Sequence, residues 1–594
     1  MSSIDRLLAP GHYRLTPGVY FVNEYVICDY PLRALKPGPT TLRLLQQCAE
    51  AHTCEELAKL SGIPIKRVEM LCDQLRWKGL LEAGPSLPLT NWPGVSIVIP
   101  TYNRAELLKR CLHALLQVDY PCLEIVVVDD GSTDETASML KRIALEFAAK
   151  DIVLRVVKHA SRQGVGTSRN TGARAASHEI LAFIDSDCVA SEQWLKELIP
   201  AFARKSLGAV GGMIRAYDHQ YLLGRYEDAR SSLFMGTRGQ QVKLEGPMTY
   251  LPTANLLIRR EAWEKPGGFA PMNFGEDVDF CRRLLLSGYE MLYLPQGTVF
   301  HDYRTDLQGF LKTRVSYASA EAALVQRHPE MQRVLFLPLE QALFAILVIG
   351  GIWGLIVKMI MLVCPTHGVR EQACHPCVGT GECGAMERGP RACPRLGWGK
   401  TAALFDTFFV RGKTPGWSSG IFAPPPHPRD RHEAPTTHPH IPLSLRRVSP
   451  ATQSISQIGM VFMAMILMLV SGGKRIAKVR KQGVPIRPIA VLRATMRGHL
   501  AYTYHLCRHL TRYYTLPMLV LSLLIPPLFA LAFILCGVVI GVDYVRLRPE
   551  IGLGTFAICL ILEDCAYEVG VVKGCIKQKT WKPLIPLIKS RERA

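Results

Sequence analysis

The chain has 594 residues, of which 48% are hydrophobic and 20% charged, with 48 Gly, 40 Pro and 18 Cys. This ordinary apolar content excludes a collagen-like or wholly unfolded chain, and 18 Cys at this length exclude a small disulfide scaffold. A chain of this length is expected to form several domains or segments.

The net charge of +20 is concentrated in the second half of the chain. Residues 331–594 hold 32 Lys and Arg against 13 Asp and Glu, a surplus of 19, so residues 1–330 are close to neutral. A nucleic-acid-binding module normally carries such a surplus on its folded domain, so we expect no nucleic acid partner. Here the surplus flanks long apolar runs, which is typical of cytoplasmic loops at a membrane; a basic, unfolded tail is the alternative.

Residues 1–90 are expected to form a small winged-helix-like module. No secretory signal opens the chain, so this end is expected to stay in the cytoplasm. The expected elements are a hairpin at 19–22 and 25–27 and helices over 40–52, 53–62 and 64–75, the second opened by a capping box from Thr53 to Glu56. The third helix mixes Lys66 and Arg67 with Glu69 and Asp73. That mixture favours a peptide-recognition or purely structural module over a DNA-binding one.

Residues 91–330 alternate between apolar strands and helices. The strands are expected at 95–99, 125–128, 152–157 and 180–184. Asn103 is expected to cap the helix that follows the first strand. This alternation predicts an α/β domain with a parallel, doubly wound sheet, whose ligands bind beyond the carboxyl ends of the strands.

The rest of the chain divides into a membrane segment at 331–363, a low-complexity linker at 364–450 and a hydrophobic, basic region at 451–594. Its apolar runs are 341–363, interrupted only by Lys358, and the charge-free stretches 450–473 and 513–542. A membrane-spanning helix needs ~20 apolar residues. Pro526 and Pro527 either kink one span or turn a re-entrant hairpin. The cluster from Lys474 to Lys481 is suited to anionic membrane lipid on the cytoplasmic side.

The linker holds Cys374, Cys377, Cys383 and Cys393. The first two have the C-x-x-C spacing of a zinc site, but the other spacings match no familiar zinc pattern. We favour an unfolded linker, or a stretch translated out of frame, over a metal site.

Acidic residues follow the second strand, at Asp129 and Asp130. Asp130 can accept hydrogen bonds from the base or ribose of a nucleotide, and Tyr102, which follows Pro100 at the end of the first strand, can stack on the same base. The alternative is a turn and helix cap, because Asp, Gly and Ser are common turn formers.

A second acidic pair, Asp185 and Asp187, follows the fourth strand. Two carboxylates two residues apart can share a hard divalent cation, which would neutralise a departing diphosphate. His301 follows a strand-like run and either completes this metal shell or is structural.

Two further segments carry chemistry. Residues 164–170 open a helix with a glycine-rich run but place Arg169 where a dinucleotide-binding pattern needs its last Gly, which argues against a nicotinamide dehydrogenase. Arg169 there suits a phosphate group, and ordinary strand-to-helix packing is the alternative. In the Gly275–Asp279 segment, an acid could take the proton of an attacking hydroxyl group.

Together these motifs resemble the family 2 glycosyltransferases of the GT-A fold. In chain order they are VSIVIPTYN at 95–103, VVVDDGSTD at 126–134, GVGTSRNTG at 164–172, FIDSD at 183–187, TANLLIRR at 253–260, GGF at 267–269 and GEDVDF at 275–280. The resemblance implies an inverting, metal-dependent hexosyltransferase that uses a UDP-sugar with Mg²⁺ or Mn²⁺. No Q-x-x-R-W signature follows Asp277, which argues against a cellulose- or chitin-type synthase.

Carried over position by position, the resemblance implies a set of site residues. Asp277 would be the general base, with Glu276 beside it. The nucleotide-sugar-binding residues would be Pro100, Tyr102, Asp130, Arg169 and Asp185, and the metal ligands Asp185, Asp187 and His301.

The flanks carry a narrower resemblance. Residues 19–83 are similar to the small peptide-binding proteins of the pyrroloquinoline quinone pathway (PqqD-like), and LEDCAYEVGVVKGC at 562–575 is similar to the tail of the mycofactocin-system glycosyltransferases. That family implies transfer of glucose to a peptide-derived redox cofactor precursor, or to its carrier, as a short β-linked chain, by an enzyme at the cell membrane with its catalytic domain facing the cytoplasm. The alternatives are a cell-envelope transferase with a lipid or polysaccharide acceptor and a non-enzymatic nucleotide-sugar or peptide-binding scaffold. The sequence leaves open the sugar and the number added, the acceptor atom, the number of membrane spans and the oligomeric state.

Overall fold

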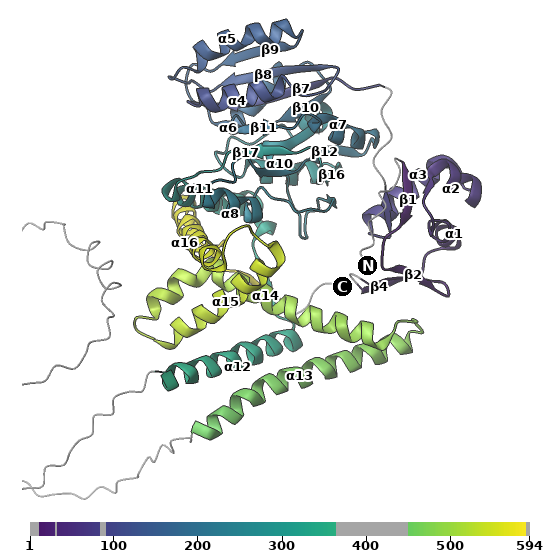
Figure 1. The fold of residues 1–594 in the computed structure, drawn as a ribbon, viewed down its shortest axis with the longest axis vertical. Coiled ribbons are helices and arrows are strands. Elements are labelled where there is room, and N and C mark those ends of the chain that lie inside the picture. Colours follow the sequence, from purple (N-terminus) through teal and green to yellow (C-terminus); the bar gives the residue numbers. More distant parts are fainter. Residues whose placement is uncertain (1–10, 30–31, 84–90, 364–449, 590–594) are drawn as a thin grey trace, which may run out of the picture. The chain divides into compact units, whose positions relative to one another are not determined.

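The structure, a computed structural model, describes residues 11–29, 32–83, 91–363 and 450–589 (Figure 1). The predicted linker, with its four candidate zinc cysteines, lies outside these residues.

The amino-terminal module combines short strands with three helices, as expected. Its elements are β1 (His12–Leu15), β2 (Val19–Val22), β3 (Tyr25–Asp29), β4 (Leu32–Leu35), α1 (Pro39–Gln47), β5 (His52–Thr53), α2 (Cys54–Ser61), α3 (Ile65–Trp77) and β6 (Leu81–Ala83). Strands β2, β3 and β4 form an antiparallel sheet, and β1 lies between β5 and β6. The capping box is present, since the Glu56 amide donates to Thr53 Oγ1 at 3.2 Å and the Thr53 amide donates to Glu56 Oε2 at 2.9 Å.

An eight-stranded mixed sheet forms the core of the next domain (Figure 1). Its strands, in spatial order, are β14 (Gln240–Gln241), β16 (Glu290–Tyr293), β12 (Leu207–Gly211), β15 (Leu256–Arg259), β10 (Ile180–Phe183), β7 (Val95–Thr101), β8 (Leu123–Asp129) and β9 (Val153–Lys158). Strands β10, β7, β8 and β9 are parallel, whereas β15 runs antiparallel to both of its neighbours. The predicted doubly wound, mostly parallel GT-A sheet is therefore confirmed.

Helices cover both faces of this sheet. They are α4 (Ala105–Leu115), α5 (Thr136–Ala149), α6 (Val165–Ala175), α7 (Trp194–Leu198), α9 (Arg260–Glu264) and α10 (Glu276–Leu286). Two further helices, α8 (Leu222–Arg230) and α11 (Leu307–Arg327), pack instead in a core cluster with carboxyl-terminal residues such as Phe556. Ile97 and Ile125 pack in one core cluster with residues of α4 and α5, while Val98 and Val126 pack in another with residues of α6 and α10. This alternation between clusters is what a strand buried on both faces requires.

A smaller sheet lies beside the carboxyl end of β10. Strand β17 (Val299–His301) lies between β11 (Cys188–Ala190) and β13 (Ile214–Ala216), antiparallel to the first and parallel to the second. The register pairs Cys188 with His301, so residues 113 positions apart meet directly after the fourth predicted strand.

The carboxyl-terminal region is helical. Its elements are β18 (Val334–Phe336), α12 (Leu339–Val363), α13 (Pro450–Lys481), α14 (Pro488–Leu521), α15 (Pro527–Leu547), α16 (Leu553–Gln578) and β19 (Leu587–Lys589). We call α13 to α16 the tail helices. Within the described residues, Gln457–Lys481 and Pro527–Leu547 are long and apolar enough to cross a bilayer, and Leu339–Ile352 is a shorter apolar helix.

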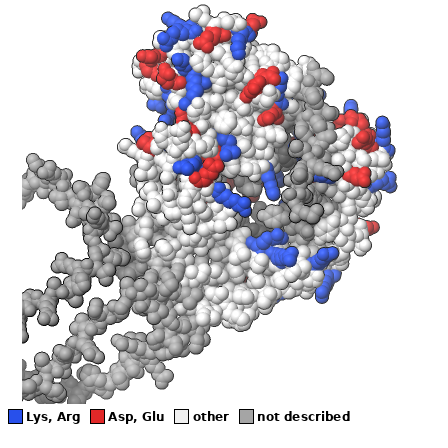
Figure 2. Space-filling model, viewed as in Figure 1, with Lys and Arg blue, Asp and Glu red and all other residues white. Residues whose placement is uncertain are grey.

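The run at 513–542 is divided between two helices. Helix α14 ends at Leu521 and α15 begins at Pro527, because a proline at the first helical position has no amide hydrogen to leave unpaired. The two helices pack against each other, so the proline pair turns a helical hairpin. Figure 2 shows charged side chains of both signs over the domain of the eight-stranded sheet, whereas the face over the tail helices is largely uncharged, with Lys and Arg at one end.

Helix α16 packs closely along α11. A Cβ atom added at Gly570 would lie 2.4 Å from the Val315 carbonyl oxygen, and one at Gly574 would lie 2.4 Å from the Ser319 carbonyl oxygen. Two glycines four residues apart thus allow the two backbones to approach, as in small-residue helix interfaces of membrane proteins.

Candidate active site

All nine residues predicted for the site line one cavity of about 990 Å³. They are Pro100, Tyr102, Asp130, Arg169, Asp185, Asp187, Glu276, Asp277 and His301. The parallel strands β7, β8 and β10 all end at the same edge of the sheet and bring Pro100, Tyr102, Asp130, Asp185 and Asp187 there. Arg169, Glu276, Asp277 and His301 reach the cavity from α6, α10 and β17.

Asp130 organises the loop that precedes α6. One carboxylate oxygen lies 2.7 Å from His159 Nδ1 and accepts from the Gln163 amide at 2.8 Å, and the other accepts from the Gly164 amide at 2.8 Å. Burial raises the pKa of Asp130, but these hydrogen bonds outweigh it and hold the pKa below its ordinary value. The carboxylate is therefore ionised and already shapes the loop, whatever else it binds.

Tyr102 lies at the wall of the cavity under a guanidinium group. The Arg162 guanidinium carbon is 4.5 Å from the centroid of the Tyr102 ring, within the range of a cation–π contact. The prediction for Asn103 is wrong. It adopts a left-handed conformation (φ 51°) and its side chain accepts from the Thr133 amide at 2.8 Å, while Asp134 accepts from the Ala105 amide at the start of α4.

The glycines of the 164–172 segment serve close packing. A Cβ atom at Gly166 would lie 2.4 Å from the Ala270 carbonyl oxygen, and one at Gly172 would lie 2.4 Å from Val98 Cγ1. This agrees with the packing alternative for these two glycines, and it leaves Arg169 as the functional group of the segment.

Arg169 connects two acidic groups of the cavity. Its guanidinium donates to Asp185 Oδ1 at 2.6 Å and to Glu276 Oε1 at 2.5 Å. Burial lowers the pKa of Arg169, but Asp185 and Glu276 outweigh it and keep the pKa above its usual range. The permanent positive charge therefore lies between the predicted metal-binding and base segments.

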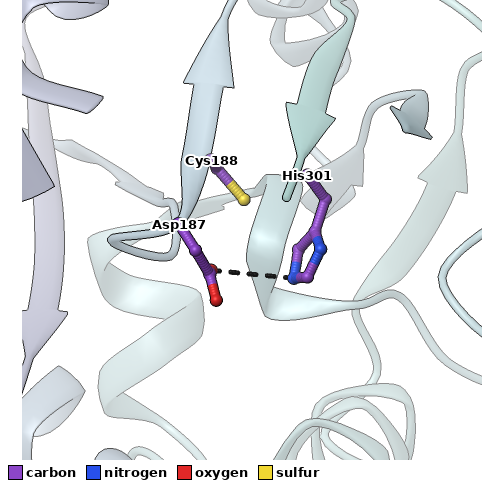
Figure 3. A group of neighbouring side chains, drawn as sticks. All are labelled: Asp187, Cys188 and His301. Carbon is purple, nitrogen blue, oxygen red and sulfur yellow. Dashed lines mark ion pairs between the residues drawn. The ribbon is translucent and has the colours of Figure 1, made fainter. Parts of the chain in front are cut away.

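Asp187 and His301 lie side by side because β11 pairs with β17 (Figure 3). His301 Nε2 is 3.6 Å from Asp187 Oδ1, and Arg104 pairs with the other carboxylate oxygen. Burial raises the pKa of Asp187, but His301 and Arg104 outweigh it and lower the pKa overall. The carboxylate is therefore expected to be charged.

This pair fits a divalent cation. Asp187 Oδ1 is buried without a hydrogen-bond partner and lies 3.6 Å from His301 Nε2, and a carboxylate oxygen with an imidazole nitrogen is a suitable donor set. Cys188 Sγ lies within 4.8 Å of a carboxylate oxygen of Asp187 and a ring nitrogen of His301, but sulfur is a soft donor and Mg²⁺ and Mn²⁺ prefer oxygen ligands. Asp185, in contrast, is engaged by Arg169 rather than grouped with Asp187 and His301.

Glu276 and Asp277 occupy the first turn of α10. Gly275 precedes them at φ 79°, in the left-handed region that favours glycine. Burial and then the charge of Glu276 raise the pKa of Asp277 to about 7. A carboxyl group that titrates near neutral pH is well suited to accept a proton from a hydroxyl group.

Sequence reasoning missed several residues of the cavity wall. These come from the loop after β9, from α11 and from the tail helices: Arg162, Arg314, Tyr317, Arg512, Glu563 and Tyr567. Charged residues inside otherwise apolar tail segments were the available signal, since ionisable groups there are seldom accidental.

The chain was compared with known proteins. Residues 96–265 match the model of the family described as Glycosyl transferase family 2. The chain is 30% identical over 296 residues to a pre-mycofactocin glycosyltransferase of Mycobacterium tuberculosis (strain CDC 1551 / Oshkosh), an alignment that covers 49% of this chain and 60% of that protein.

Two further similarities cover less of the chain. A poly-beta-1,6-N-acetyl-D-glucosamine synthase of Staphylococcus epidermidis is 26% identical over 226 residues, which is 38% of this chain and 54% of that protein. Among solved structures, the mannosyltransferase PcManGT from Pyrobaculum calidifontis, in complex with GDP-Man and Mn²⁺, is 25% identical, with a TM-score of 0.32 over 40% of this chain and 65% of that chain.

Proposed function

We propose that this protein, an enzyme whose residues 96–265 form a family 2 glycosyltransferase domain, transfers glucose from UDP-glucose to a hydroxyl group of the peptide-derived mycofactocin precursor. Repeated transfer would build a short β-linked oligosaccharide. The similarity to the mycobacterial pre-mycofactocin glycosyltransferase supports the choice of acceptor. The observation that carries the chemistry is the presence of Asp277 and the Asp187–His301 pair in one cavity.

The reaction is a single displacement with inversion at the anomeric carbon. The acceptor oxygen forms its bond to that carbon as the carbon's bond to the diphosphate oxygen breaks. The acceptor proton passes to the Asp277 carboxylate, and UDP leaves with the electron pair. A base with a pKa of about 7 supports this role, because it can both accept a proton at neutral pH and release it afterwards.

Asp187 and His301, with Asp185 nearby, would hold Mg²⁺ or Mn²⁺. The unpartnered Asp187 Oδ1 supports this assignment. A bound divalent cation would supply positive charge for the diphosphate. Tyr102 and Asp130, at the ends of β7 and β8, would contact the base and ribose, with Pro100 beside them, and Arg169 would balance the acids of the cavity.

We further propose that the enzyme works at the cell membrane with its catalytic domain on the cytoplasmic side. Two apolar helices, Gln457–Lys481 and Pro527–Leu547, support membrane association. The exposed basic residues at the end of α13 favour the side that carries anionic lipid: Lys474, Arg475, Lys478, Arg480 and Lys481.

The amino-terminal module would recognise the peptide part of the acceptor or its carrier. Extended peptides commonly add a strand to an open sheet edge. In the three-stranded sheet of this module, β2 and β4 are the two edge strands. Deletion of residues 1–90 should therefore reduce use of the peptide-derived acceptor.

One alternative is a cell-envelope transferase that uses a lipid or polysaccharide acceptor. The apolar tail helices and the similarity to a staphylococcal polysaccharide synthase favour it. It would be preferred if deletion of residues 1–90 left acceptor use unchanged.

Mass spectrometry tests the proposal directly. The full chain in detergent is incubated with Mn²⁺, UDP-glucose and the mycofactocin precursor. A product heavier by one or more hexoses is expected. Hydrolysis of UDP-glucose without such a product would support a glycosyltransferase whose acceptor belongs to the cell envelope. Absence of both reactions would contradict the proposed enzyme.

A further inference from the structure

The catalytic cavity extends from the strand ends onto the tail helices. Arg512 of α14 and Tyr567 of α16 line the same cavity as Asp277. Tyr250 connects the two ends electrostatically. Burial raises the pKa of its hydroxyl, Asp277 raises this pKa further and Arg512 lowers it. The Asp277 carboxylate and the Arg512 guanidinium therefore both act on the Tyr250 hydroxyl. Helix α14, which carries Arg512, thus reaches the part of the cavity near the proposed base.

Other arginines near this interface are neutralised by close carboxylates. Arg508 Nη1 lies 2.5 Å from Asp564 Oδ2, and Arg314 Nη2 lies 2.5 Å from Glu227 Oε2. These pairs place positive charge inside the protein with a partner already present. They have no charge left over for a ligand.

Arg512 differs from these arginines. Its closest carboxylate oxygen is Asp564 Oδ1 at 3.9 Å, and Asp564 is already paired with Arg508. Within the described residues, Arg512 donates no hydrogen bond to a protein acceptor, and 30% of its side chain is exposed. The guanidinium carbon lies 3.8 Å from the Tyr567 ring centroid, so the group is held by stacking while its N–H donors remain available.

Aromatic rings form the adjacent wall. Phe274 and Tyr317 line the cavity and are 38% and 37% exposed. Their rings contact each other edge to face, with 5.6 Å between the ring centroids. The Tyr567 hydroxyl donates to Glu321 at 2.8 Å, which fixes its ring beneath Arg512. Aromatic surface that is left exposed inside a cavity suits a planar, apolar ligand body.

We infer that Arg512 and Tyr567 form an acceptor subsite that binds an oxyanion, a carboxylate or a phosphate, carried beside a planar apolar group. This rests on the proposed transferase function and adds the chemical class of its acceptor. The guanidinium edge would pair with the oxyanion in the bidentate geometry that Arg favours. The acceptor hydroxyl would then lie in the part of the cavity that contains Asp277.

Ligand-observed NMR titration of the full chain in detergent, with UDP and the diamagnetic cation Mg²⁺ present, tests the inference. The probes are 4-hydroxyphenylacetate, its neutral amide and 4-hydroxyphenyl phosphate. The variants are Arg512→Gln, Arg512→Lys and, as a matched control, Arg493→Gln, which removes an exposed charge from the same helix outside the cavity. UDP affinity is measured in every sample and reports the donor end separately.

Wild-type protein and Arg493→Gln are expected to bind an anionic probe about tenfold tighter than the amide, the effect of one charge-assisted hydrogen bond. Whichever anion binds tighter identifies carboxylate or phosphate. Arg512→Gln should bind anion and amide equally, and Arg512→Lys should recover part of the preference. If Arg512→Gln misfolds and loses UDP affinity, the Arg512→Lys variant replaces it: a reduced but measurable preference for the anion supports the inference, and an unchanged preference contradicts it.

Equal binding of anion and amide by wild-type protein, retention of the preference in Arg512→Gln, or absence of probe binding would overturn the inference. Failure of wild-type protein to bind UDP would count against the proposed function instead, because the anion preference compares the probes with one another and is not read from UDP.

Discussion

Asp185 and Glu276, 91 positions apart in the chain, are held by the same guanidinium group. Arg169 donates to the first at 2.6 Å and to the second at 2.5 Å from a position that is almost completely buried. This bridge connects the acidic segment after β10 to the first turn of α10, so the proposed metal-binding and base segments are joined through one side chain.

Removal of the Arg169 bridge should therefore damage stability as well as chemistry. We expect Arg169→Ala to lower the free energy of unfolding by about 3–5 kcal/mol, the usual cost of breaking a buried ion pair. Thermal melts monitored by circular dichroism measure this. Arg174→Ala, at an exposed position of the same helix, should melt like the wild type, and an equal loss in both variants would contradict the bridge.

Replacement of the proposed base should separate catalysis from folding. Asp277→Asn keeps the size of the side chain but cannot accept the acceptor proton, so transfer should fall by about 10²–10⁴-fold. Asp187→Ala should likewise abolish transfer. Product formation is followed by mass spectrometry and folding by thermal melts. Retained activity in a folded Asp277→Asn protein would exclude this residue as the base.

The pH dependence follows from the same carboxyl group. Because Asp277 has a pKa of about 7 and is proposed to act as the ionised base, kcat/KM should fall as the pH drops below about 7. Glu276→Gln removes a negative neighbour that raises this pKa, so the acidic limb should move to lower pH. A limb that stays in place would assign the titration to another group.

The cation assignment is tested by binding alone. Asp187→Asn and His301→Ala should each weaken Mn²⁺ binding, by about tenfold or more, because each removes a candidate donor. Isothermal titration calorimetry measures the dissociation constant without a reaction. Cys188→Ser should bind Mn²⁺ like the wild type, because Mn²⁺ prefers oxygen ligands over a soft sulfur donor. Stronger loss in Cys188→Ser than in His301→Ala would reverse the assignment.

The packing of α16 on α11 is tested with two glycines of one helix. Gly570→Ala would place a methyl group 2.4 Å from the Val315 carbonyl oxygen, and we expect a cost of about 1–3 kcal/mol. Gly554→Ala meets nothing within 4 Å and should stabilise the helix by up to ~1 kcal/mol. Thermal melts in detergent compare the two variants. Equal melting temperatures would mean that α16 does not pack as described.

The strand positions could be predicted because buried parallel strands leave a continuous apolar run in the sequence. The runs at 95–99, 125–128 and 180–184 became the buried strands β7, β8 and β10, whereas the run at 152–157, which contains Arg155, became the largely exposed edge strand β9. The cap at Asn103 was mispredicted because Asp134, 31 positions away, takes the amide of Ala105 in its place. The local tendency of Asn to cap a helix is overridden here, because the Asp134 carboxylate accepts the hydrogen bond from the Ala105 amide.

By itself, the sequence determined which residues end the parallel strands, and hence that Tyr102, Asp130, Asp185 and Asp187 share one edge of the sheet. That follows from strand period and direction, which are local properties. Only the tertiary structure decided that Arg169 donates a hydrogen bond to Asp185, that His301 lies beside Asp187 and that Arg512 lines the cavity. These contacts join elements far apart in the chain, and they depend on strand register and helix packing, which no local pattern encodes.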